Sequence, residues 1–141
     1  MKLILTRHGE TIENKKGITQ GHLPGKLSKS GIEQAKKLAL RLKNEKIDAI
    51  YSSDLARAAD TTKEIAKFHP NTPIKFTKDL RERNWGEFQG KNKKEIPWAK
   101  EGDIKNYIEP QKGEKPQDLF RRAKKLLKYI FSKHKKGIIL L

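Results

Sequence analysis

The feature that most constrains this chain is its alternation of short apolar runs with longer amphipathic segments. Apolar runs of strand length occupy residues 3–6, 47–51, 74–76 and 138–141. Between these runs, apolar side chains recur at helical spacing over residues 32–42, 55–66 and 119–131. Strands that alternate with helices predict an α/β fold, a three-layer α/β/α sandwich around a mostly parallel central sheet. In such a fold, ligands bind beyond the carboxyl ends of the strands.

Hydroxyl and carboxylate side chains mark where two of these helices begin. Ser28 and Ser30 are both candidate N-caps of the first long helix, and Ser30 has capping-box spacing to Glu33. The Ser-Ser-Asp turn at 52–54 is a candidate cap for the next helix. The start of the first helix therefore stays open between the two serines.

The segment between the third and fourth strands is less regular. Residues 79–116 contain several Gly, Pro and Trp residues, which predicts an irregular excursion with short helices near 92–99 and 103–108. No internal repeat or linker divides the chain, and its 141 residues suit a domain of ordinary size. We therefore expect residues 1–141 to form one domain.

Composition narrows the possible partners. The chain has 33 Lys and Arg against 17 Asp and Glu, a net charge of +16, so its surface attracts phosphate in any form. The lysines are spread along several helices, which argues against a specific nucleic-acid partner. No apolar run approaches the ~20 residues that span a bilayer, so we expect no membrane partner. The absence of cysteine excludes disulfides and thiolate zinc sites and fits a cytoplasmic location.

Two predicted strands deliver basic side chains to the ligand-binding edge of the sheet. The first runs into Arg7 and His8, and the second runs into a turn followed by Arg57. Guanidinium groups clamp a phosphoryl group through paired hydrogen bonds. Their positive charge also disfavours imidazolium, which keeps His8 neutral and nucleophilic. This arrangement predicts attack of the imidazole on phosphorus and a phosphohistidine intermediate.

Several motifs follow one another along the chain in a recognisable order. They are Arg7-His8-Gly9-Glu10-Thr11, the loop Gln20–Ser28 with Gly31–Ala35, the stretch Ser52–Ala58 with Thr61 and Thr62, Leu80–Gly90, and Gly113-Glu114-Lys115 with Arg121 or Arg122. Together they resemble the histidine phosphatase superfamily, also called the phosphoglycerate mutase-like family. The resemblance is colinear and spans essentially the whole chain.

The resemblance assigns roles to five residues. It implies that His8 is the phosphorylated nucleophile and that Arg7, Arg57 and Asn14 bind the phosphoryl oxygens. Glu82 would be the general acid that protonates the leaving oxygen and then deprotonates water. The family chemistry implies no metal and no cofactor.

The remaining histidines and tryptophans are expected beside the site, at the surface or in packing. His22 falls in the variable loop and is expected on the substrate side of the pocket. His69 and His134 stand near predicted helix ends, where we expect surface positions. Trp85 and Trp98 are expected to serve in packing and to offer an aromatic wall to the pocket.

One family element has no counterpart within the 141 residues. The resemblance predicts a second histidine, followed by Gly, after the last strand, then a further helix and strand, but the sequence stops at Leu141. Losing such a donor typically costs about 10²–10³ in rate. Three explanations stay open: a naturally short member with a reduced site, a truncated chain or interrupted gene, or a fold completed by a second copy as a homodimer. We also hypothesise that His22 takes the place of the second histidine.

The leading functional hypothesis is a metal-independent phosphomonoesterase that acts on a small phosphorylated substrate. Residues 84–88 and the compact length favour the phosphatase branch, while Arg81 and Arg83 keep a phosphoglycerate mutase open as an alternative. A non-catalytic phosphate-binding remnant is a second alternative because the second histidine is missing. Nucleic-acid binding ranks below both.

Overall fold

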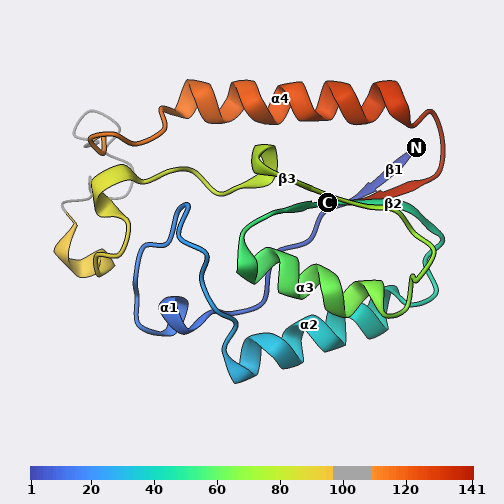
Figure 1. Ribbon diagram of the computed structural model, residues 1–141, viewed down its shortest axis with the longest axis horizontal. Coiled ribbons are helices and arrows are strands. Elements are labelled where there is room, and N and C mark those ends of the chain that lie inside the picture. Colours follow the sequence, from blue (N-terminus) through green and yellow to red (C-terminus); the bar gives the residue numbers. More distant parts are fainter. Residues whose placement is uncertain (97–108) are drawn as a thin grey trace.

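The computed structural model describes residues 1–96 and 109–141, which build a four-stranded sheet (Figure 1). The strands are β1 (Lys2–Ile4), β2 (Ile47–Ser53), β3 (Ile74–Thr77) and β4 (Ile138–Leu140). They lie in the order β1-β4-β2-β3, and every neighbouring pair is parallel. The predicted parallel sheet is therefore confirmed. Because all four strands run the same way, the segments that follow them emerge at one edge.

Helices cover both faces of this sheet (Figure 1). The helices are α1 (Ile12–Lys15), α2 (Lys29–Leu42), α3 (Ala56–Ala66) and α4 (Pro116–Lys133). Helices α2 and α3 lie together on one face, and α4 crosses the other face. The three-layer α/β/α arrangement expected from the sequence is confirmed.

The core has two halves because successive residues of a strand point to opposite faces. On one face, Ile50 and Leu140 pack with Leu42 of α2 and Ile65 of α3. The other half, which α4 covers, is formed by Ala49, Tyr51, Leu126, Ile130 and Ile139. Burial on both faces explains why the central strands are mainly apolar, with Asp48 as the exposed exception in β2.

The structure decides the start of α2, which the sequence left open, and corrects the expected cap of α3. Ser28 is the N-cap of α2, since its Oγ accepts a hydrogen bond from the Gly31 N–H at 3.0 Å. The expected cap of α3 is wrong: the helix begins after Leu55 without a side-chain cap. The Asp54 carboxylate instead takes both donors of Arg81, at 2.6 and 2.5 Å, and this bidentate ion pair competes with capping.

The segment after β3 is irregular, as expected. Its regular turns are the 3₁₀ helices η1 (Lys78–Leu80), η2 (Gly86–Phe88) and η3 (Lys93–Glu95). The first part of the expected helix near 92–99 is thus a single 3₁₀ turn. Its remainder, the expected helix at 103–108 and Trp98 all lie outside the described residues. In the parts of the chain that the structure describes, no helix has the length and apolar character needed to cross a bilayer.

Two histidines expected at the surface are more enclosed than predicted. His69 is only 8% exposed, because the turn after α3 folds back through the Thr72 hydroxyl, which donates to the Ile47 carbonyl at 3.0 Å. His134 is half-buried, with its Nε2 2.8 Å from the Tyr51 hydroxyl. Both expectations are corrected by contacts between residues far apart in the sequence.

Candidate active site

The carboxyl edge of the sheet brings the His8 loop and the start of α3 together. His8 follows β1, and Arg57 is the second residue of the helix that follows β2. The Gly9 N–H donates to Thr61 Oγ1 at 3.1 Å, which ties the loop to α3. Gly9 also packs so closely that a Cβ there would lie 2.3 Å from the Gly31 carbonyl oxygen. The loop that carries His8 therefore requires glycine after the histidine.

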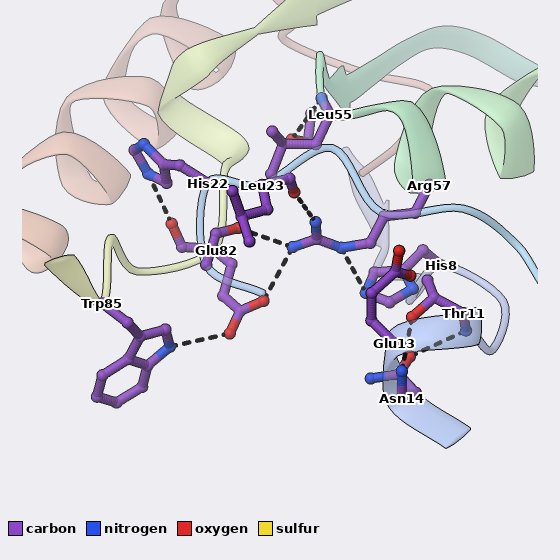
Figure 2. A network of polar contacts seen from close by, with 12 residues as sticks. His8, Thr11, Glu13, Asn14, His22, Leu23, Leu55, Arg57, Glu82 and Trp85 are labelled. Atoms are coloured by element: carbon purple, nitrogen blue, oxygen red, sulfur yellow. Dashed lines mark hydrogen bonds and ion pairs between the residues drawn. The ribbon is translucent and has the colours of Figure 1, made fainter. Parts of the chain in front are cut away.

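Hydrogen bonds on both ring nitrogens determine the protonation of His8. Its Nε2 lies 3.1 Å from Arg57 Nε, which can only donate, so Nε2 must carry the lone pair (Figure 2). The proton is therefore on Nδ1, which donates to the Gly9 carbonyl at 2.7 Å. Burial lowers the pKa of His8, and the charges of Arg57 and Arg7 lower it further, against the opposing effect of the Gly9 carbonyl. The neutral, nucleophilic imidazole is thus the favoured form.

The Arg57 side chain is 2% exposed and organises the surrounding loops. Its Nη1 donates to the Leu23 carbonyl at 2.6 Å, and its Nη2 donates to the Gly21 carbonyl at 3.0 Å. The same Nη2 forms an ion pair with Glu82 Oε2 at 2.9 Å. One guanidinium group therefore connects the His8 loop, residues 21–24 and the segment that carries Glu82.

Glu82 is held between a cation and an indole. While Oε2 pairs with Arg57, Oε1 accepts a hydrogen bond from Trp85 Nε1 at 3.0 Å (Figure 2). The Glu82 side chain is 43% exposed, so protons can exchange with solvent. Trp85 lines the cavity, as expected, and its bond to Glu82 adds a role that the sequence did not indicate.

A cavity of about 730 Å³ lies among these groups. The five residues that the sequence singled out, Arg7, His8, Asn14, Arg57 and Glu82, all line it. Asn14 uses its Oδ1 to accept from the Thr11 N–H, which orients its amide group. The cavity thus combines a neutral imidazole, two guanidinium groups, a side-chain amide and a carboxylate, a set suited to a phosphoryl group and its transfer.

The expectation that His22 lines the substrate side is wrong. Its Nε2 lies 3.0 Å from the Glu82 backbone carbonyl, and the residue is not among those lining the cavity (Figure 2). The hypothesis that His22 replaces a second histidine therefore lacks a geometric basis. The His22 ring contacts the backbone of the Glu82 segment and does not line the cavity that His8 lines.

Some residues around the site were missed by the sequence reasoning. Thr61 is one, although it lay within a quoted motif and its hydroxyl accepts from the Gly9 N–H. Glu114 and Arg122 are others: the motif gave no role, and it did not separate Arg121 from Arg122. In the structure, Arg122 contacts the Glu82 segment, whereas Arg121 pairs with Asp118 on the exposed side of α4.

The fold and the site together define an α/β protein whose parallel sheet presents histidine, arginine and a carboxylate to one cavity at its carboxyl edge, where such folds bind ligands. Comparison with known families gives the more specific result. The family model described as the histidine phosphatase superfamily (branch 1) matches residues 3–141. The chain belongs to this superfamily, as its motifs predict.

Similar proteins include both phosphatases and mutase-like proteins. A metal-independent phosphoserine phosphatase of Arabidopsis thaliana is 38% identical over 148 residues, covering 95% of this chain and 60% of the relative. Phosphoglycerate mutase-like protein 4 of the same plant is 37% identical over 142 residues, covering 95% of this chain and 62% of the relative. The solved structure of Bacillus stearothermophilus YhfR has a TM-score of 0.84 and 31% identity, covering 98% of this chain and 72% of that one. The chain spans 44–62% of the length of the curated relatives it matches.

Proposed function

We propose that the chain is a metal-independent phosphomonoesterase that forms a phosphohistidine at His8. The observation that carries this proposal is the position of Arg57, which contacts His8 Nε2 and Glu82 Oε2 within one cavity. A phosphoryl group bound by Arg57 would lie between the nucleophile and the acid. That order of groups is the one that in-line transfer from an ester oxygen to nitrogen requires.

In the first step, the oxygens of the phosphoryl group take donors from Arg7, Arg57 and the Asn14 amide. The Arg57 Nε–H turns from His8 Nε2 to a phosphoryl oxygen, which frees the lone pair. Nε2 attacks phosphorus, an N–P bond forms, and the P–O bond to the alcohol breaks. Glu82 gives its proton to the departing oxygen. A bound dianion takes over the donors of Arg57, which releases the Glu82 carboxyl from its ion pair and lets it face the departing oxygen.

In the second step, water replaces the alcohol. The Glu82 carboxylate accepts a proton from the water as its oxygen attacks phosphorus. The N–P bond breaks, His8 recovers its neutral form, and inorganic phosphate leaves. The Nδ1–H bond to the Gly9 carbonyl stabilises the imidazole in the required tautomer in both steps.

The arginines that could have favoured a mutase are engaged elsewhere. Arg81 forms its bidentate pair with Asp54, and Arg83 is buried with its Nε bonded to the Glu114 carbonyl at 2.7 Å. Neither lines the cavity, which supports phosphatase over mutase chemistry. Bisphosphoglycerate-dependent interconversion of the two phosphoglycerates would instead support the mutase, as the mutase-like relative suggests.

The direct test is turnover of para-nitrophenyl phosphate together with acid trapping of the phosphoenzyme. We expect the wild-type chain to release phosphate and to carry an acid-labile phosphoryl group, and His8→Ala to do neither. His134→Ala is the matched control, since this histidine contacts Tyr51 and does not line the cavity, and it should retain both properties. A wild-type chain that binds phosphate without forming phosphoenzyme would identify a non-catalytic remnant.

The substrate, the location and the assembly remain predictions. We propose a small phosphorylated metabolite as the substrate, because the cavity holds one phosphoryl-binding cluster and an indole wall. The composition still predicts a cytoplasmic location. Homodimer formation and the absence of a specific nucleic-acid partner are predictions that sedimentation and salt-dependent binding measurements would check.

A further inference from the structure

The segment that carries Glu82 has little regular structure of its own. After η1 ends at Leu80, residues 81–85 lie in no helix or strand until η2 begins at Gly86. A general acid has to be held within a fraction of an ångström of the oxygen that it protonates. The contacts of this short segment with the rest of the protein therefore decide how well Glu82 is placed.

Arg122 of α4 connects the start of this segment to η1. Its Nη1 donates to the Asp79 carbonyl at 2.8 Å, and its Nη2 donates to the Glu82 carbonyl at 3.0 Å. His22 Nε2 also lies 3.0 Å from the same Glu82 carbonyl. The backbone of the proposed acid is thus held by two side chains from α4 and from the loop after α1.

Glu114 fixes the guanidinium group in turn. Its two oxygens accept from Arg122 Nε at 2.5 Å and from Nη2 at 2.8 Å, and both side chains are less than one fifth exposed. The backbone of Glu114 is also bonded to the segment, because its N–H donates to the Asn84 carbonyl at 2.8 Å. The ion pair and the Glu82 segment therefore form one connected network.

We propose that Glu114 and Arg122 are positioning residues for protonation of the leaving group. They touch neither the cavity nor a reacting atom, and they act by holding the Glu82 backbone in place. This inference rests on the proposed function and adds to it the residues that control one chemical step. The guanidinium plane is needed, because an ammonium group cannot reach Asp79, Glu82 and Glu114 at once.

The leaving group provides a readout specific for this role. Para-nitrophenolate departs readily without a proton, whereas an alkoxide such as that of glycerol phosphate must be protonated as it leaves. The ratio kcat/KM covers the steps up to the first irreversible one, here transfer to His8. A displaced acid should therefore lower kcat/KM for the alkyl ester selectively, while damage to the whole site should lower it for both.

The experiment compares Glu114→Gln and Arg122→Lys with wild type on both esters, with thermal unfolding followed by circular dichroism. Arg121→Lys is the matched control, because Arg121 is exposed and pairs only with Asp118 among the residues described. We expect kcat/KM for glycerol phosphate to fall about 10–100-fold in both variants, and that for para-nitrophenyl phosphate to change by less than about threefold. The control should leave both values unchanged.

Equal losses on the two esters in a folded variant would overturn the positioning role and leave the phosphatase proposal standing. Unchanged kinetics on both esters would overturn it as well. If Glu114→Gln fails to fold, the milder Arg122→Lys decides the question, since it keeps the charge. A wild-type chain that turned over neither ester would overturn the proposed function, and this inference with it.

Discussion

Replacing Arg57 with lysine tests the central feature of the site. The guanidinium group uses three nitrogens, which donate to His8, to three backbone carbonyls of the loop at 21–24 and to Glu82. A lysine keeps the charge, but its single nitrogen cannot reach acceptors on different sides. In Arg57→Lys, the carbonyls of Gly21 and Leu23 should therefore lose their donor.

The size of the effect follows from burial. Gly21 is buried, whereas Leu23 is exposed enough for water to replace the lost donor. A buried carbonyl left without a partner costs about 1–3 kcal/mol, so we expect the free energy of unfolding to fall by about 2 kcal/mol. The donors aimed at the phosphoryl group are displaced as well, and kcat/KM for para-nitrophenyl phosphate should fall by about 10² or more.

Urea unfolding followed by circular dichroism measures the first effect, and steady-state kinetics measures the second. Arg41→Lys, at an exposed position of α2, is the control and should change stability by less than about 0.5 kcal/mol. If Arg57→Lys were as stable as this control and retained its turnover, the guanidinium geometry would not be what organises the site.

Three further predictions concern the core, a close contact and pH. Ile130→Ala should lower the free energy of unfolding in urea by about 2–5 kcal/mol, since Ile130 is 0% exposed. The control Leu127→Ala, at a 36% exposed position, should lower it by less than about 1 kcal/mol. Gly31→Ala should destabilise by about 1–3 kcal/mol in the same assay despite the better helix propensity of alanine, because its Cβ would meet the Glu10 carbonyl oxygen at 1.9 Å; a stabilised variant would contradict the contact. The pKa of His8 is lowered in the folded chain, so as the pH falls the unfolded chain protonates this imidazole before the folded chain does. His8 therefore contributes stability at pH values above its ordinary pKa of 6.5, and this contribution is lost as the pH falls through the folded pKa. The pH dependence of urea unfolding should therefore be weaker in His8→Asn, and an unchanged slope would refute this.

Much of the fold could be predicted because the signals are local. Apolar periodicity identified the four strands and the three long helices, with boundaries that differ by a residue or two for most elements. The parallel sheet followed from the alternation of strands and helices. The N-cap of α3 was the exception, since Arg81 takes the Asp54 carboxylate from 27 positions away.

The candidate site was predictable in part for the same reason. His8 and Arg57 each stand four positions after the end of a strand, β1 and β2, and the parallel strand rule places both at one edge. Glu82 has no such relation to a strand, and only the family motif pointed to it. The histidines show the limit most clearly: His22, His69 and His134 gave no local sign of their surroundings, and the expectations for all three were wrong.

The sequence by itself determined the element order, the α/β class and the family, because these depend on periodicity and motifs that neighbouring residues carry. Only the tertiary structure decided which serine caps α2, that Arg122 and not Arg121 supports the Glu82 segment, and that one guanidinium group joins His8 to Glu82. The physical reason is that a hydrogen bond requires two atoms within about 3 Å of each other. Residues 49 or 25 positions apart, as Arg57 is from His8 and Glu82, reach that distance only when the sheet and its helices have packed.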